Sequence, residues 1–307
     1  MIEVENLTKD FKIDFWSRPC RVLDGVTFKI NKGKVTGFLG TNGIGKTTTI
    51  NLILKFNMPT SGGIKYENGL LNQDGTFTSK LGYLPERSYS YPLLSGREFL
   101  TYMAKMNNVD SKEIDERIEF WMQKLNLSAA INRKIKTYSK GMAQRIGFIS
   151  AVLHQPELII LDEPLSGLDP IGRKEIKSII KKLNGDGKTI FFTTHVVSDV
   201  EEVCDDVIVL DKGKIKIDCS VNELIYKNSS MKYIVRINLD KELGKLELSD
   251  FKTLLNQGCN DLSQSCSFLV GQAEKDEFIY RLALNKIKIM SVEPDHPSLE
   301  DALYGRG

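Results

Sequence analysis

The first two thirds of the chain alternate short apolar runs with longer segments of helical periodicity. Residues 34–39, 81–84, 158–161 and 189–194 are rich in aliphatic and β-branched side chains and predict strands. The last three runs do not alternate between apolar and polar positions, which indicates strands buried on both faces. This alternation of strands and helices predicts an α/β fold with a parallel sheet flanked by helices.

Between Ser95 and His154 the pattern becomes wholly helical. Ser95 and Glu98 have the spacing of a capping box at the start of a first helix. A second helix carries apolar residues on one face, and a third begins near Ser139. We interpret the aromatic and methionine positions of the first two helices as core packing: Phe99, Tyr102, Met103, Met106, Ile114, Ile118, Trp121 and Leu125. Residues from about 90 to 154 are therefore expected to form an inserted helical subdomain.

The pattern changes again beyond about residue 220. Residues 206–217 predict a hairpin that turns at Gly213. Alternating apolar residues from Tyr233 to Leu239 then predict a half-buried strand, followed by a helix at 277–286 and a strand at 287–292. We expect a first domain over residues 1–220 and a small α+β extension over residues 221–307.

Composition excludes several classes of protein. Hydrophobic residues make up 41% of the chain and charged residues 27%, as in an ordinary globular protein. The net charge of +2 argues against a nucleic-acid-binding protein, so no nucleic-acid partner is expected. No apolar run reaches the roughly 18 residues of a membrane span, and the N-terminus does not resemble a signal peptide. The five cysteines are scattered without CxxC spacing, which favours a reduced, cytoplasmic protein.

A glycine-rich segment between the first of these strands and a helix at 46–56 matches the pattern GxxxxGK[ST]. Its backbone N–H groups and the helix N-terminus are suited to wrapping phosphates. Lys46 would reach the β- and γ-phosphates of a nucleotide, and the Thr47 hydroxyl would bind Mg²⁺. The candidate nucleotide-binding residues are Gly40, Thr41, Asn42, Gly43, Ile44, Gly45, Lys46, Thr47 and Thr48.

Further polar residues follow three other predicted strands at the same edge of the sheet. Asp162 and Glu163 end the apolar strand 158–161. Asp162 is predicted to hold Mg²⁺ through its water shell, and Glu163 to act as the general base that activates water. Glu86 follows the strand 81–84, and His195 follows the strand 189–194. We expect His195 to contact the γ-phosphate.

The segment from Tyr138 to Arg145 (YSKGMAQR) is similar to the signature sequence of ATP-binding cassette (ABC) ATPases, usually LSGGQ followed by QR. Only Ser139 and Gly141 match the first five positions, and the variant resembles cassettes of the drug- and antibiotic-export branch. The resemblance covers roughly residues 1–220. It implies a P-loop NTPase fold of the ABC type, with the helical subdomain inserted and the α+β extension appended. Residues 297–301 (PSLED) resemble the end of that extension in the same branch.

The resemblance also implies roles for individual residues. Ser139 and Gly141 would face the γ-phosphate bound by another cassette, in a head-to-tail homodimer or a pair with a second cassette protein. Asp169 lies in a segment that resembles the D-loop, and His195 falls at the switch-histidine position. Glu86 replaces the usual Q-loop glutamine and would contact Mg²⁺. Phe11 would stack on adenine, with Phe15 and Trp16 as rivals.

The function implied is ATP hydrolysis that powers export. The cofactors would be ATP and Mg²⁺. The partner would be an integral membrane permease on a separate chain, which would hold this subunit at the cytoplasmic face of the membrane. The alternative is a soluble ABC ATPase that acts on ribosomes or DNA. Such proteins usually carry two cassettes, a long coiled-coil insertion or a basic docking segment, and none is visible in the sequence.

Overall fold

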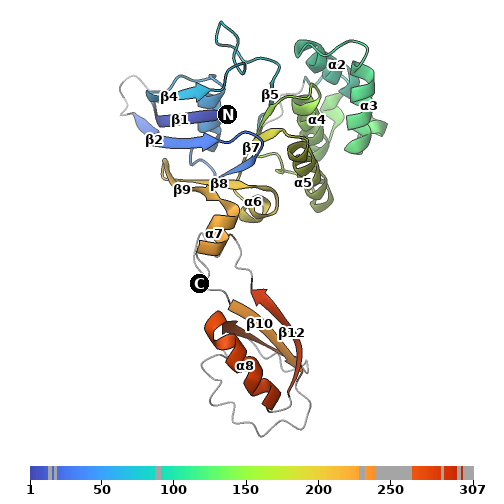
Figure 1. Cartoon of the computed structure of the whole chain (residues 1–307). Helices are drawn as coiled ribbons and strands as arrows, with labels where there is room; N and C mark the ends of the chain where they lie inside the picture. Colours follow the sequence, from blue (N-terminus) through green and yellow to red (C-terminus); the bar gives the residue numbers. More distant parts are fainter. Residues whose placement is uncertain are drawn as a thin grey trace. The chain divides into compact units, whose positions relative to one another are not determined.

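The computed structural model describes residues 1–12, 16, 19–86, 91–227, 232–238, 265–284, 287–295 and 299. The chain divides into two compact units, Met1–Val221 and Asn222–Gly307. Figure 1 shows the elements of each unit in sequence colours. No helix in the described residues is long and apolar enough to cross a membrane.

The first unit is built on a six-stranded sheet in the order β5-β6-β7-β3-β8-β9. All the neighbours from β5 to β8 pair in parallel, and β9 pairs antiparallel with β8. The parallel arrangement brings the carboxyl ends of these five strands to one edge. The polar residues predicted to act together follow four of them: β3, β5, β6 and β7. The bounds in chain order are β3 (Val35–Leu39), β5 (Leu81–Leu84), β6 (Leu158–Asp162), β7 (Thr189–Thr194), β8 (Asp206–Asp211) and β9 (Lys214–Ser220).

Both faces of this sheet are covered, as the unbroken apolar runs predicted. In β6, Leu158 and Ile160 belong to one hydrophobic cluster, while Ile159 and Leu161 belong to another. Because neighbouring side chains on a strand point to opposite faces, each face has its own core. Helices α1 (Lys46–Ile53), α5 (Pro170–Gly185) and α6 (Val197–Val203) pack on the sheet, and α4 (Lys140–Val152) packs on its edge strand β5. The first of these ends three residues before the predicted limit at residue 56.

A separate antiparallel sheet, which the sequence patterns did not predict, covers one side of the core (Figure 1). It has the order β2-β1-β4, and its strands are β1 (Ile2–Phe11), β2 (Cys20–Ile30) and β4 (Ser61–Tyr66). The ring of Phe28 in β2 lies 5.5 Å from that of Phe38 and stacks 6.1 Å from that of Phe191, centroid to centroid. These aromatic contacts attach the antiparallel sheet to the central one.

The helices predicted between Ser95 and His154 lie on the other side of the central sheet. This segment contains α2 (Gly96–Met106), α3 (Ile114–Lys124), α4 (Lys140–Val152) and the short 3₁₀ turns Ser128–Ala130 and Ile135–Thr137. The Ser95–Glu98 capping box is formed. Phe99 is buried as predicted, but the interpretation of Tyr102 and Met106 as core was wrong, because they are 43% and 63% exposed.

The second unit holds a three-stranded antiparallel sheet in the order β11-β10-β12, packed on one helix. The elements are α7 (Val221–Lys227), β10 (Lys232–Asn238), β11 (Ser265–Gly271), α8 (Gln272–Leu284) and β12 (Lys288–Asp295). The long helix therefore begins five residues before its predicted start at 277. Of the PSLED segment only Leu299 is described, and Phe15 also lies outside the described residues.

Candidate nucleotide site

The glycine-rich loop joins the end of β3 at Leu39 to the start of α1 at Lys46. Gly43 and Gly45 have φ angles of 78° and 118°, which L side chains rarely adopt. A Cβ at Gly45 would also lie only 3.0 Å from the Leu23 side chain. The loop conformation therefore requires glycine, and its backbone leads directly into the N-terminus of a helix, where anions are stabilised.

The Lys46 ammonium lies between the loop and the end of strand β6. Nζ donates a hydrogen bond to the carbonyl oxygen of Gly40 at 2.7 Å and approaches that of Thr41 at 3.4 Å. It also lies 3.2 Å from Oε1 of Glu163, and both side chains are largely buried. The ammonium is thus held between the loop carbonyls and the Glu163 carboxylate.

Asp162 at the end of β6 is hydrogen-bonded on both carboxylate oxygens. Thr47 Oγ1 donates to Oδ2 at 2.8 Å, and Thr193 Oγ1 donates to Oδ1 at 2.5 Å. Burial raises the pKa of Asp162, the carboxylates of Glu86 and Glu163 raise it further, and the two hydroxyl hydrogen bonds oppose that rise. The site concentrates negative charge where a cation would relieve it.

Glu163 occupies the left-handed backbone region, with φ at 50°. This conformation is uncommon for a residue other than glycine and is held by the surroundings. The Glu163 N–H donates to Thr193 Oγ1 at 2.9 Å, and its carbonyl accepts from Gln144 Nε2 at 3.2 Å. Its carboxylate meets Nδ1 of His195 at 3.0 and 3.1 Å. The turn therefore presents the Glu163 carboxylate to His195 and Lys46.

These groups surround an open pocket of about 320 Å³. The structure thus brings the glycine-rich loop together with the three residues predicted from separate strands: Glu86, Glu163 and His195. The pocket is lined by Asn42, Gly43, Gly45, Lys46, Thr47, Thr48, Glu86, Glu163, Ser166 and His195. The Ile44 side chain instead packs against the hydrophobic core.

The oxygen donors at this pocket fit Mg²⁺. The Thr47 hydroxyl and the Asp162 carboxylate already meet at 2.8 Å, and Glu86 lies close enough to act on the pKa of Asp162. No group of three or more His, Cys, Asp or Glu side chains in the described chain could hold a metal by itself. Mg²⁺ commonly binds through one or two protein ligands together with substrate phosphates, so a dedicated cage is not required.

The predicted signature and D-loop residues do not line this pocket. Ser139 is exposed and caps α4, where its hydroxyl accepts from the Met142 N–H at 3.2 Å, and Gly141 lies in the first turn. Asp169 caps α5 by accepting from the Gly172 N–H at 3.1 Å. Its carboxylate also lies 3.5 Å from Arg145 of α4. The signature helix and the D-loop are therefore joined to each other.

The aromatic candidates for adenine lie at the end of β1 and just beyond it. Phe11 pairs with Cys20 and is 37% exposed, and the Lys9 ammonium lies 5.0 Å from its ring centre. Trp16 is 91% exposed. Neither residue lines the pocket of the glycine-rich loop.

Three residues with contacts at the site were not predicted from the sequence. Thr193 holds both Asp162 and the Glu163 backbone, Gln144 holds the carbonyls of Glu163 and Pro164, and Ser166 lines the pocket. The position of Thr193 two residues before His195 on a sheet strand was the available signal. Gln144 belongs to the signature segment, but no pattern indicated that its side chain faces inward.

Comparison with known proteins identifies the family. Residues 23–166 match the family model described as ABC transporter. The chain is 33% identical to the uncharacterised ABC transporter ATP-binding protein YhaQ of Bacillus subtilis, over 98% of this chain and 96% of the relative. It is 36% identical to the bacitracin transport ATP-binding protein BcrA of Enterococcus faecalis, over 74% of this chain and 72% of the relative.

Solved structures agree with this assignment. The ATP-binding subunit of an ABC transporter superposes with a TM-score of 0.66 at 28% identity, covering 74% of this chain and 92% of that one. A dimeric ATP-binding cassette in a post-hydrolysis state, bound to ADP and Pi, superposes with a TM-score of 0.64 at 25% identity, covering 72% and 98%. The P-loop NTPase fold of the ABC type is confirmed. The chain belongs to the ATP-binding proteins of ABC transporters and is an ATPase.

Proposed function

We propose that this chain powers export through a separate transmembrane permease, and that it works as one half of a cassette dimer. The main support for a dimer is that the residues expected to contact one nucleotide lie in two separate places on this chain. Lys46, Glu163 and His195 line one pocket, whereas Ser139 and Gly141 lie elsewhere, at the exposed N-terminus of α4. The N–H groups at a helix N-terminus are suited to binding a phosphate. The Ser139 hydroxyl accepts from the Met142 N–H and can still donate its own hydrogen. A second cassette, arranged head to tail, would place its Ser139 and Gly141 against the nucleotide of the first.

The proposed chemistry uses the contacts within the pocket. The backbone of residues 40–48 wraps the phosphates, and Lys46 exchanges its loop carbonyls for the β- and γ-phosphates. Glu163 accepts a proton from the attacking water while His195 contacts the γ-phosphate. Thr47, Asp162 and Glu86 would hold Mg²⁺, which supplies charge neutralisation on the phosphates. Phe11 provides a ring for adenine, and Asp169 couples the two halves of the dimer.

The site for the permease is proposed on the helical subdomain. Apolar side chains are exposed at the start of α2 and along it: Tyr91, Leu93, Tyr102 and Met106 are between 43% and 69% exposed. The rings of Tyr91 and Tyr102 pack edge to face at 5.6 Å, which gives this surface a fixed shape. Exposed apolar patches of this kind mark interaction sites. Tyr91 is only five residues after Glu86 of the nucleotide pocket in the sequence. We propose that this short stretch of chain couples permease docking to ATP binding.

The direction of transport, export, is a separate and more specific part of this proposal. The name of the relative BcrA, a bacitracin transport protein, supports it for an antibiotic exporter. We further propose that residues 1–220 form the ATPase domain and that residues 221–307 are an extension to it. The permease would hold the chain at the cytoplasmic face of the membrane.

Purification from detergent-solubilised membranes tests the proposal. We expect the tagged chain to recover an integral membrane protein in a fixed ratio. The double variant Tyr102→Lys/Met106→Lys should lose this partner and keep its basal ATPase activity. Met58→Lys, a matched change at an apolar side chain that is 77% exposed, should keep the partner. Recovery of ribosomes or DNA with no membrane protein would instead support the soluble class of ABC ATPase.

A further inference from the structure

A second and larger pocket, of about 700 Å³, lies away from the nucleotide site. It is bounded by α3 of the helical subdomain, by α5, and by the residues that lead into β6 and β7, Gln155, Pro156 and Lys188. These residues come just before strands β6 and β7, at the amino ends of the strands. The nucleotide pocket lies at the carboxyl ends of the same strands. A five-residue strand separates its two ends by roughly 16 Å. The volume is that of a small-molecule site.

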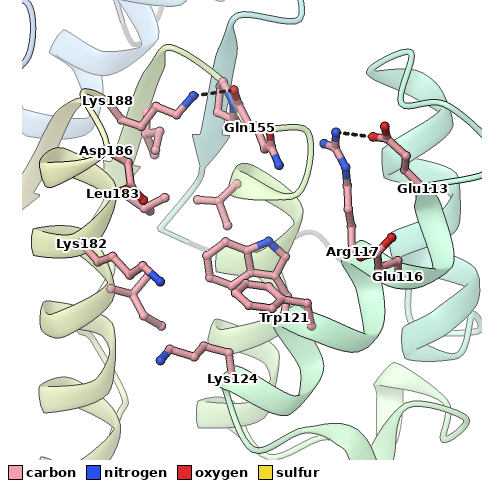
Figure 2. A pocket seen from close by; sticks show the side chains of 15 residues that line it. Glu113, Glu116, Arg117, Trp121, Lys124, Gln155, Lys182, Leu183, Asp186 and Lys188 are labelled. Carbon is pink, nitrogen blue, oxygen red and sulfur yellow. Dashed lines mark hydrogen bonds and ion pairs between the residues drawn. The ribbon is translucent and has the colours of Figure 1, made fainter.

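One wall of this pocket is aromatic and aliphatic. Trp121 projects from α3 into the space (Figure 2). Ile159, Ile179 and Leu183 also line the pocket. The neighbouring ring of Phe120 packs against Trp121 edge to face at 5.3 Å, and Phe120 is 52% exposed. The indole N–H of Trp121 makes no hydrogen bond to any described residue. An accessible indole face with a spare donor is suited to a planar ring.

Two cations at the same pocket have no acidic partner among the described residues. Lys124 is the last residue of α3, and Lys182 lies in the last turn of α5. In Figure 2 both side chains extend from their helices to the same side of Trp121. Neither forms an ion pair with a described residue. By contrast, the other two cations are engaged, because Arg117 binds Glu113 at 2.5 Å and Lys188 donates to the Gln155 carbonyl at 3.0 Å.

Two of the three acidic side chains of the lining lie away from this pair, and the third is near Lys182. Glu113 and Glu116 are at the beginning of α3, and Glu116 is eight residues, or about 12 Å along the helix, from Lys124. Asp186 is the C-cap of α5, one turn beyond Lys182. Lys124 and Lys182 therefore form a cationic region beside the indole ring, with Glu113 and Glu116 at the opposite end of α3. This cationic region would attract an anion.

We propose that this pocket binds a planar aromatic anion, with its ring on Trp121 and its anionic group between Lys124 and Lys182. The class includes aromatic carboxylates, sulfonates and phosphates of one or two fused rings. A ligand bound there would contact α3 of the helical subdomain and α5, which packs on the central sheet. The proposal does not depend on export or on the permease.

The sequence supplies a clean fluorescence test, because the chain has two tryptophans. In a Trp16→Phe background Trp121 is the sole tryptophan. The probe is 8-anilinonaphthalene-1-sulfonate, and its neutral match is N-phenyl-1-naphthylamine, which lacks only the sulfonate. Titrations are made with excess Mg-ADP to occupy the nucleotide pocket. We expect saturable probe emission sensitised by Trp121.

Charge variants then identify the anion site. Lys124→Gln/Lys182→Gln should weaken binding of the sulfonate by about tenfold or more and leave the neutral probe unchanged. The matched double variant Lys174→Gln/Lys181→Gln, at exposed lysines of α5 outside the pocket, should bind both probes as the parent does. Unchanged sulfonate affinity in the first variant would overturn the proposal. Equal loss of both probes, or the absence of saturable emission sensitised by Trp121, would also overturn it.

Discussion

Nδ1 of His195 lies 3.0 Å from Oε2 of Glu163, and the Lys46 ammonium approaches the other oxygen of the same carboxylate at 3.2 Å. An ionised carboxylate only accepts hydrogen bonds, so a proton on Nδ1 would be required for a hydrogen bond in this contact. A neutral ring then presents Nε2 as an acceptor. Only the imidazolium form can donate to Glu163 and to a phosphate oxygen at once, and we propose that His195 in this form links the proposed base to the phosphate.

Replacement of His195 by alanine removes this connection. We expect kcat for ATP hydrolysis to fall about a hundredfold, with a smaller change in KM, because the ring acts on the reacting groups more than on nucleotide affinity. Steady-state ATPase assays measure both constants. His154→Gln removes a histidine that lies outside the pocket and should keep the parental rate at neutral pH. Equal activity of His195→Ala and the parent would contradict the assigned role.

Thr193→Val tests the residue that the sequence did not reveal. The change keeps the shape of the side chain but leaves the Glu163 N–H and one oxygen of Asp162 without their partner, which costs about 1–3 kcal/mol. We expect a lower unfolding free energy and a clear loss of kcat. Thr36→Val on the adjacent strand β3 is the matched control, because the buried Thr36 hydroxyl has no hydrogen-bond partner in the described part of the chain. That variant should be neutral or more stable. Comparable effects of the two changes on unfolding free energy and kcat would show that the Thr193 hydrogen bonds have no specific role at the site.

Lys46→Ala removes the ammonium that is held between the loop and Glu163. Loss of this charge from the phosphate site should weaken ATP binding by about a hundredfold or more. Equilibrium titration with a fluorescent ATP analogue measures the change. Lys34→Ala, at the opposite end of β3 where the lysine pairs with Asp206, should retain the affinity. Tight binding by Lys46→Ala would refute the assignment of the loop.

Stability should depend on pH through His154. Burial lowers the pKa of this imidazole below its ordinary value of 6.5, and Nε2 donates to the Leu81 carbonyl at 3.0 Å. The unfolded chain therefore takes up this proton at a higher pH than the folded chain does. Its contribution to stability is complete above about pH 6.5 and is lost as the pH falls through the lower, folded pKa. Urea unfolding between pH 7.5 and 5 should show this loss, and His154→Gln should show a smaller one.

Much of the nucleotide site could be predicted because its signals are local. The loop from Gly40 to Thr47 is one contiguous motif, and Asp162, Glu163 and His195 each follow an apolar run that forms a parallel strand. Parallel topology then brings their ends to one edge. The role of Thr193 could not be predicted, because it depends on the register that pairs it with Asp162. That register is a tertiary property.

The antiparallel sheet and the outer side of α2 show where sequence patterns were insufficient. β1 and β2 carry charged residues at partly or fully exposed positions and pair with register shifts, so their alternation is interrupted. Tyr102 and Met106 have helical spacing with the buried Phe99, but the neighbouring helices do not cover them. Periodicity identifies a face of a helix, whereas its burial depends on which elements pack against it.

The central claim is that Glu163 activates water within a site completed by a second cassette. Glu163→Gln keeps the size of the side chain and removes its basicity. The most direct measurement is single-turnover hydrolysis of ATP by this variant, combined with its molecular mass in solution with Mg-ATP. We expect tight ATP binding, turnover reduced by at least about a hundredfold, and a stable dimer that holds two uncleaved nucleotides. Hydrolysis at the parental rate by a monomer would contradict the account.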